Sequence, residues 1–213
     1  MERTREVFAA DPPLWALWQI FCRVLLRIKG ILLGAVLRAP HLQLGPRCVV
    51  RGAKHISLGR NIRAKSELWL EAITHYGEQR FQPVIRIEND VCFSDGVHIS
   101  CIDHIVIKKN VLMGSRIYIS DHNHGLYWGP TQSLPSEPPA HRKLGGGGPV
   151  IIGENVWIGD NVIIVGPITI GDGAIVGANS VVREDVQPGA VVAGIPARLI
   201  KCFNPATHTW ERA

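Results

Sequence analysis

Apolar residues recur at every sixth position near the C-terminus, where residues 150–185 read VIIGEN VWIGDN VIIVGP ITIGDG AIVGAN SVVRED. Ordinary alternating strands have a period of two and do not explain a period of six. One short strand and one turn per repeat does explain it, and three such repeats complete a triangular coil. The repeating positions, expected to stack inside the coil, are Ile152, Ile158, Ile164, Ile170, Val176 and Val182.

The same rhythm continues upstream with occasional slips of two residues, which a slightly longer corner would produce. The sequence therefore predicts an all-β fold, a parallel β-helix over residues 41–201. The expected inward positions are Leu44, Val50, Leu58, Ala64, Leu70, Ile87, Phe93, Ile99, Ile107, Met113 and Ile119.

Two segments interrupt this rhythm. Residues 74–83 are a short insertion at one corner, and residues 121–149 form a long protruding loop rich in proline and glycine. Loops of that length in compact domains are usually functional or disordered, and the ends of this one must re-enter the coil near one another. The run Gly145–Gly148 is interpreted as a flexible hinge and not as a phosphate cradle, because no helix follows it.

The N-terminal segment, residues 1–40, has a different pattern. Between Leu14 and Arg38, polar residues recur at Gln19, Arg23 and Arg27 and apolar residues fill most other positions, which predicts an amphipathic helix. Its charges argue against a membrane-spanning helix. It packs on the coil or a neighbouring subunit, or it docks on a membrane surface through Trp15, Trp18 and Phe21. Residues 202–213 are treated as a C-terminal tail without a predicted element.

Composition narrows the setting. The chain is 46% hydrophobic, which is enough apolar material for a packed core. Its formal net charge of +5 suits anionic ligands or an anionic membrane surface as partners. No nucleic-acid-binding module is recognisable, so we expect no nucleic-acid partner. The five cysteines are scattered without zinc spacing, which favours reduced thiols. The opening MERTREVFAADPP lacks the pattern of a secretory signal, so we expect a cytoplasmic protein, peripheral at the inner membrane if the helix docks there.

Three motifs resemble one family. The hexapeptide run, the segment NVWIG (155–159) and the ending AGIPARLIK (193–201) are similar to bacterial hexapeptide-repeat acyltransferases, in the branch of galactoside, maltose and nodulation-factor O-acetyltransferases. The segment DHNHG (121–125) looks most like the O-acetyltransferases of surface polysaccharide and lipopolysaccharide synthesis. The resemblance covers residues 44–201. It implies a left-handed coil, a homotrimer with active sites between subunits, acetyl-CoA as co-substrate, a sugar or glycan acceptor and no required metal.

The resemblance also implies roles for single residues. Counting from Asn110 brings His124 onto the family's catalytic base, with His122 two residues earlier. The residues matched to the acetyl-CoA site are Trp157, Gly159, Asp160, Gly177, Ala178, Arg183, Arg198 and Lys201. The residues matched to the acceptor site are Ser94, Asp95, Asp121, His122 and Asn123. Arg183 and Glu184 stand where the family commonly has a Thr-Lys pair, so the family's contacts to the CoA phosphates do not carry over in detail. The family asparagine that contacts the sugar acceptor falls near Ser94–Asp95 here, so the identity of the acceptor does not carry over either.

The chemistry needs a base, because a protonated sugar hydroxyl is a poor nucleophile. A neutral imidazole within hydrogen-bond reach takes the proton as the oxygen attacks the thioester. A carboxylate such as Asp121 or Asp103 is suggested as the group that orients His124.

Other interpretations remain open at the level of sequence. Asp121, His122 and His124, with His98 and His104 one coil earlier, could instead form a zinc site like that of the γ-class carbonic anhydrases, which share the fold. A non-catalytic scaffold is a second alternative. In a purely structural interpretation His124 is a turn residue and Trp157 a packing residue. Arg198 and Lys201 are then solvated charges.

Overall fold

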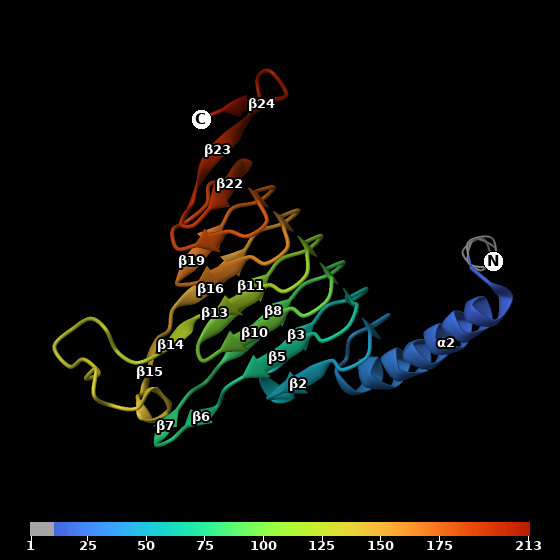
Figure 1. The fold of residues 1–213 in the computed structure, drawn as a ribbon, viewed down its shortest axis with the longest axis horizontal. Helices are drawn as coiled ribbons and strands as arrows, with labels where there is room; N and C mark the ends of the chain where they lie inside the picture. Colours follow the sequence, from blue (N-terminus) through green and yellow to red (C-terminus); the bar gives the residue numbers. More distant parts are fainter. Residues whose placement is uncertain (1–10) are drawn as a thin grey trace.

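The computed structural model describes residues 11–213, which form three large sheets, parallel except for the last two strands of the first, and one α-helix (Figure 1). The first ten residues, and with them most of the opening segment, lie outside the described part. The first sheet has nine strands. They are β1 (Gln43–Leu44), β4 (Arg63–Ala64), β9 (Cys92–Phe93), β12 (Leu112–Met113), β17 (Trp157–Ile158), β20 (Ile175–Val176), β22 (Ala190–Gly194), β23 (Ala197–Asn204) and β24 (Thr209–Arg212).

The other two large sheets have six and five strands. The second sheet contains β2 (Val49–Arg51), β5 (Trp69–Ala72), β10 (His98–Cys101), β13 (Tyr118–Ser120), β18 (Ile163–Val165) and β21 (Val181–Val182). The third contains β3 (Ile56–Leu58), β8 (Val84–Ile87), β11 (His104–Ile107), β16 (Pro149–Ile152) and β19 (Ile168–Ile170).

Successive strands of the chain pass from one sheet to the next, and each strand pairs in parallel with the strand one coil later. Thus Trp157 of β17 pairs with Ile175 of β20, and Ile163 of β18 pairs with Val181 of β21. Side-chain contacts between neighbouring coils join residues 18 apart in the regular C-terminal part and 20 apart near the N-terminus. Eighteen residues are three hexapeptides and the two extra residues are the predicted longer corners, so the parallel coil is confirmed.

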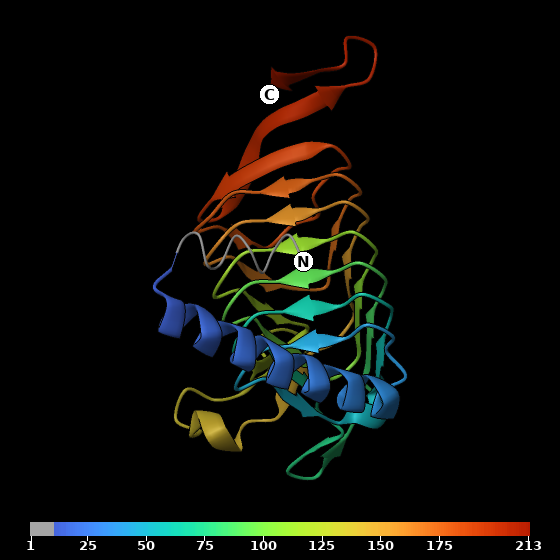
Figure 2. The same ribbon diagram turned by 90° about the vertical axis from the view of Figure 1, so that its right-hand side faces the viewer.

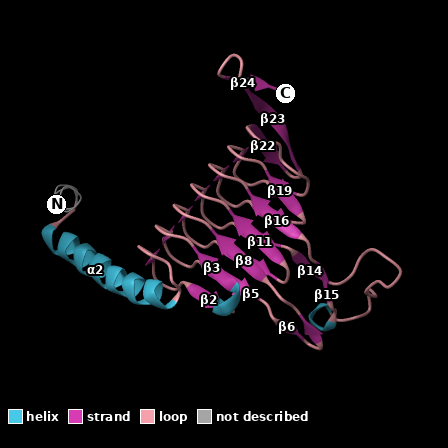
Figure 3. Ribbon diagram, turned by 180° about the vertical axis from the view of Figure 1, so that it is seen from behind, coloured by secondary structure: helices cyan, strands magenta, loops and turns pink. Residues whose placement is uncertain are grey.

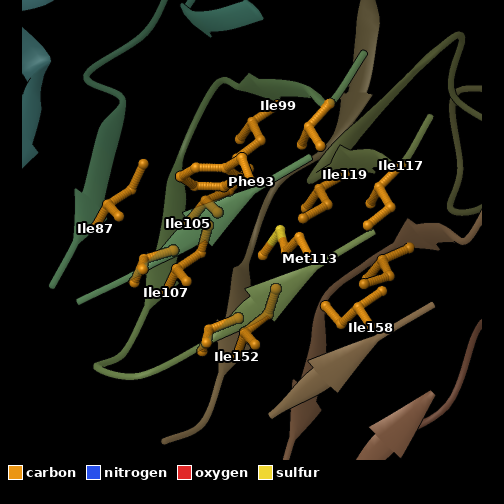
Figure 4. Close-up of a cluster of buried hydrophobic side chains, with 14 of the residues drawn as sticks. Ile87, Phe93, Ile99, Ile105, Ile107, Met113, Ile117, Ile119, Ile152 and Ile158 are labelled. Atoms are coloured by element: carbon orange, nitrogen blue, oxygen red, sulfur yellow. The ribbon is translucent and has the colours of Figure 1, made fainter. Parts of the chain in front are cut away.

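The predicted inward positions form the core. Ile152, Ile158, Ile164 and Ile170 have no exposed surface, and Ile99, Ile107, Met113 and Ile119 upstream are equally enclosed. Figure 4 shows part of this cluster, with side chains from successive coils stacked on one another. Val50, in the first coil, is the one predicted position that is only half-buried, because the coil covers it from one end alone.

Three corners of the C-terminal coils place an asparagine in a left-handed backbone. Asn155, Asn161 and Asn179 all have φ near +58°, a conformation that asparagine adopts more readily than most residues. The amide of Asn161 donates to that of Asn179 one coil away at 2.9 Å, so the corners also bond to one another. Gly159 is needed for a different reason: a Cβ there would lie 2.6 Å from the backbone nitrogen of Ala178.

The helix α2 (Pro13–Val36) lies against the N-terminal coil at one end and extends away from it along most of its length (Figures 1 and 2). Contact is made where Gly30 and Gly34 approach the chain at Leu42 and Ala39. A Cβ on Gly30 would lie 2.3 Å from the Leu42 carbonyl oxygen. The predicted N-terminal helix is thus present. Among residues 11–213, no helix is long and apolar enough to cross a membrane.

Both interruptions of the coil contain antiparallel hairpins on the same side of the molecule (Figures 1 and 3). The short insertion forms β6 (His75–Tyr76) and β7 (Gln79–Arg80). The long loop leaves and re-enters through β14 (His122–His124) and β15 (Leu144–Gly146), as its expected closure requires. Between them lies the 3₁₀ helix η2 (Pro139–His141), and a second, η1 (Ala53–His55), precedes β3.

Two segments differ from the expectations. Gly146, Gly147 and Gly148, interpreted as a flexible hinge, have defined left-handed φ values of 110°, 86° and 99°, and Gly146 pairs with His122 in the hairpin. Residues 202–213, for which no element is predicted, complete β23 and form β24, which fold back antiparallel on β22.

Candidate active site

Asp121 anchors the point where the long loop leaves the coil. It follows β13 directly, has no exposed surface and accepts hydrogen bonds from five groups. Its donors are the backbone N–H groups of Ile102 (2.9 Å), Asp103 (2.9 Å) and His104 (3.1 Å), the Cys101 thiol (3.2 Å) and His122 Nδ1 (2.9 Å).

These bonds decide the charge of the carboxyl group. Burial alone would raise the pKa of Asp121, but the hydrogen bonds from His122 and from the backbone at Ile102 outweigh it, and the pKa lies below the ordinary value. The carboxylate is therefore ionised near neutral pH. An ionised carboxylate only accepts, so Nδ1 of His122 carries the proton that it donates to Asp121.

His122 is held tightly and is largely enclosed. Its side chain is 6% exposed, and the Ser120 hydroxyl donates to its backbone carbonyl at 2.9 Å. The enclosed pair of His122 and Asp121 closes the base of the loop.

His124 lies two residues further along β14 and is exposed. Its Nδ1 is 3.3 Å from the Tyr76 hydroxyl of the insertion hairpin, and the Tyr127 hydroxyl donates to its backbone carbonyl at 2.5 Å. Neither suggested carboxylate contacts this imidazole. Asp121 binds His122, and Asp103 accepts from the Gly148 N–H at 2.6 Å, because both are used to fix the ends of the loop.

Four of the residues matched to the acetyl-CoA site gather on another edge. Gly159 and Asp160 follow β17, Gly177 and Ala178 follow β20, and these corners join the first sheet to the second. Trp157 stands on the outer face of the first sheet and is 52% exposed. The Asp160 carboxylate also accepts the Ser115 N–H of the neighbouring coil at 2.5 Å, so it stabilises the corner.

The three basic residues matched to the acetyl-CoA site are exposed. Arg198, on β23, lies 3.2 Å from Glu184 in an exposed ion pair, and Lys201 lies further along the same strand. Arg183 follows β21. Exposed pairs of this kind contribute little to stability, so these side chains are available to a ligand.

The residues matched to the acceptor site are divided between the two edges. Asp121, His122 and Asn123 lie beside His124 at the base of the loop. Ser94 and Asp95 instead follow β9, on the edge that carries Gly159 and Asp160. Hydrogen bonds from the Ser66 hydroxyl and N–H lower the pKa of Asp95, whose carboxylate completes the corner.

The histidines proposed for a zinc site lie in different settings. His98 stacks on Trp69 with ring centroids 4.4 Å apart, and burial lowers its pKa. Its Nε2 is the one buried side-chain nitrogen or oxygen without a hydrogen-bond partner among residues 11–213. In the same part of the chain, no three His, Cys, Asp or Glu side chains are grouped to hold a metal.

Sequence reasoning missed Tyr76, Gln79 and Tyr127, which surround the base of the loop. The presence of tyrosines in the two segments that interrupt the coil is a weak signal for them, since nothing in the repeat requires an aromatic there.

Comparisons with known proteins place this geometry in a family. The bacterial transferase hexapeptide family matches six repeats over residues 149–184. A putative lipopolysaccharide biosynthesis O-acetyl transferase of Escherichia coli, WbbJ, is 37% identical over 167 residues, which cover 78% of this chain and 81% of the relative. The chain belongs to the hexapeptide-repeat acetyltransferases. The galactoside O-acetyltransferase of E. coli is 35% identical over 105 residues, 47% of this chain and 45% of that one.

Solved structures agree with the assignment. A hexapeptide-repeat acetyltransferase of Vibrio cholerae, complexed with acetyl-CoA, is 25% identical with a TM-score of 0.50, and the match covers 76% of this chain and 71% of that one. An N-acyltransferase of Bacillus cereus matches with a TM-score of 0.57 at 20% identity over 77% of this chain and 84% of that one, which shows the fold alone. The prediction of an acyltransferase enzyme is therefore confirmed, and the expected co-substrate agrees with the Vibrio complex.

The Asp121 anchor yields a prediction on stability. Replacing Asp121 by Asn leaves several enclosed donors without a charged acceptor, and we expect the free energy of unfolding to fall by about 3 kcal/mol near neutral pH. Because the folded-state pKa of Asp121 lies below its unfolded value, its contribution is complete above the unfolded pKa and is lost as the pH falls through the folded one. The gap between the two proteins should narrow in acid, as measured by urea unfolding at a series of pH values.

The matched control is Asp185→Asn, which alters an exposed corner carboxylate with one backbone donor, Thr169, at 2.7 Å. Asp185→Asn should lower the free energy of unfolding far less than Asp121→Asn does at neutral pH, and by a similar small amount at every pH. Equal losses in the two variants, or a gap for Asp121→Asn that does not change with pH, would contradict the anchor role.

Proposed function

We propose that this enzyme transfers an acetyl group from acetyl-CoA to a hydroxyl of a sugar or surface-polysaccharide precursor, with His124 as the general base. The observation that carries the assignment is an exposed imidazole fixed at the start of the long loop in a chain of this family. The relatives named as O-acetyltransferases, one of them in lipopolysaccharide biosynthesis, support an oxygen acceptor on a glycan.

Access distinguishes the two histidines of β14. Both have Nδ1 beside an oxygen, so both direct Nε2 elsewhere. An acceptor hydroxyl and a thioester must both reach the basic nitrogen. The side chain of His122 is 6% exposed and bound to Asp121, whereas His124 is exposed. His122 therefore acts as a structural support and His124 as the base.

The reaction follows from these positions. Nε2 of His124 takes the proton of the acceptor hydroxyl as its oxygen attacks the thioester carbonyl carbon. The tetrahedral intermediate then expels the CoA thiolate, which receives the proton from the imidazolium, so the histidine is restored. Trp157 offers an apolar surface to the pantetheine arm, and Arg183, Arg198 and Lys201 offer charge to the phosphates.

The separation of His124 from most of the acetyl-CoA residues supports a homotrimer. His124 lies where the chain passes from the second sheet to the third, whereas Gly159, Asp160, Gly177 and Ala178 lie where it passes from the first to the second. Within one chain, His124 and these four residues therefore lie on different edges of the coil. A homotrimer of left-handed coils, as the resemblance implies, would bring the loop of one subunit to the acetyl-CoA edge of the next.

The helix α2 suits a membrane surface on the cytoplasmic side. Gly30 and Gly34, which approach the coil, fall on the same face as Arg23 and Arg27, at separations of four and seven. The broad apolar face is therefore turned away from the coil, with Trp15, Trp18 and Phe21 each more than half exposed. The helix from Pro13 to Val36 has no acidic residue that an anionic lipid surface would repel.

The choice of base is tested by paired substitutions. A panel of nucleotide sugars and glycans, assayed for thiol release from acetyl-CoA, identifies the acceptor. With that acceptor, His124→Ala should lower kcat by about 10²-fold or more, the size expected for loss of a general base, at an unchanged affinity for CoA.

The comparison variant is His122→Ala, which should lower the melting temperature and retain much more of kcat. The opposite pattern, near-normal turnover without the imidazole of His124 and a full loss at normal stability without that of His122, would move the catalytic role to His122.

Membrane docking is tested with vesicles containing an anionic phospholipid. Replacing Trp15, Trp18 and Phe21 together by Ser should abolish co-sedimentation while turnover on a soluble acceptor is kept, because the outer face of α2 contacts nothing in the coil. Replacing Leu134, a loop residue that is 65% exposed, by Ser is the control and should leave binding unchanged. Undiminished vesicle binding by the triple variant would exclude docking through this face and leave a second subunit as its partner.

A further inference from the structure

The insertion at residues 74–83 is bound to the long loop by two of its side chains. Gln79 uses both ends of its amide on Leu144 of β15. Its Nε2 donates to the Leu144 carbonyl at 3.0 Å, and its Oε1 accepts the Leu144 N–H at 2.7 Å. Leu144 in turn pairs with His124 across the β14–β15 hairpin. The insertion hairpin, the loop and the catalytic strand therefore form one unit, which lies on one side of the coil (Figures 1 and 3).

Tyr76 is the member of this unit that reaches the imidazole. Its ring meets the ring of His124 edge to face, with centroids 5.5 Å apart and planes inclined by 73°. Its hydroxyl lies 2.6 Å from the Ala140 carbonyl oxygen and 3.3 Å from Nδ1 of His124.

Counting hydrogens fixes the direction of these two bonds. A phenol hydroxyl has one proton, and a carbonyl oxygen can only accept, so that proton is given to Ala140. Toward His124 the Tyr76 oxygen must then accept, which requires the hydrogen of the neutral imidazole to be on Nδ1. Nε2 consequently has its lone pair free, which is the form that can take a proton from an acceptor hydroxyl.

We propose that Tyr76 is a positioning residue that selects the Nδ1–H tautomer of His124 and fixes the orientation of its ring. This inference rests on the proposed role of His124 as the base. No proton moves at Nδ1 during the reaction: Nε2 gains the acceptor's proton and returns it to the thiolate, and the Nδ1–H bond to Tyr76 is kept throughout. The phenol oxygen thus also stabilises the imidazolium by accepting from it.

The second phenol near His124 has a different task. Tyr127 donates to the backbone carbonyl of His124 and accepts from Arg142 at 3.1 Å, so it holds the main chain and not the imidazole. Of these two tyrosines, only Tyr76 can select the tautomer of His124.

The direct test is the nitrogen NMR spectrum of ¹⁵N-histidine-labelled protein, with the His124 signals assigned from the spectrum of His124→Ala. In the wild type above the titration range, the His124 signals should be those of an Nδ1–H imidazole. Tyr76→Phe keeps the ring contact but removes the accepting oxygen, so the signals should shift toward a mixture of the two tautomers. Tyr118→Phe, which removes a phenol hydroxyl with no hydrogen bond in the described part of the chain, is the matched control and should leave them unchanged.

Kinetics separate positioning from folding. Tyr76→Phe should lower kcat about fivefold to tenfold, the effect of one lost hydrogen bond, while the KM for acetyl-CoA and the melting temperature stay close to the wild type. In the His124→Ala background, the same substitution should change the residual rate by less than twofold, because there is no imidazole left to position.

The outcomes distinguish this inference from the proposed function. A wild-type spectrum with Nε2–H, or a Tyr76→Phe spectrum identical to the wild type, overturns the inference even if His124 proves essential. Equal losses from Tyr76→Phe in both backgrounds also overturn it, since they indicate a structural role. Normal turnover in His124→Ala defeats the proposed base, whatever the tautomer.

Discussion

The stacking of apolar side chains inside the coil at six-residue intervals is the constraint on which the rest of the structure depends. Each enclosed Ile or Val packs on the residue of the same column one coil away, so every strand is held in register with its neighbours. A shift by one residue would turn the outward side chains, such as the large ring of Trp157, into the core. The corners can therefore occur only at fixed points, and corner residues of successive coils line up along the edges of the prism. Most of the site residues lie on two of these edges.

The long loop interrupts this register, and the chain must return to the coil at the point where it left. Where the chain leaves the coil after β13, three backbone N–H groups at residues 102–104 meet the carboxylate of Asp121. The chain then pairs with itself as β14 and β15, so the interruption ends where it began. This closure gives His124 a defined position on a strand instead of a place in an irregular loop, and the insertion hairpin adds a contact to its imidazole. A base has to be held within hydrogen-bond reach of its substrate, and the closure provides that rigidity.

Much of the coil could be predicted from the sequence because its signal is local and repeated. The inward columns, the longer corners, the helix near the N-terminus and the closure of the long loop all follow from spacing. The contact of Tyr76 with His124 could not be predicted, because it joins two interruptions that are 48 residues apart and carry no periodic signal. The hydrogen bond of Asp121 to His122 instead of His124 could not be predicted, because it depends on the path of the short turn after β13. The strands β23 and β24 follow no hexapeptide pattern, and their pairing depends on the open edge that β22 leaves. The division of the acceptor residues between two edges could not be predicted either, because it depends on which two sheets each corner joins.

The central claim is that the imidazole of residue 124 stands beside the reacting thioester in the assembled enzyme. A crystal structure of the protein with acetyl-CoA tests it most directly through the distance from Nε2 of His124 to the thioester group. The account predicts that the pantetheine arm passes Trp157 of one subunit and ends with its thioester next to His124 of another, leaving room for a hydroxyl between them. An arm that ends against a different face of the coil, with His124 remote from every thioester in the assembly, would contradict it.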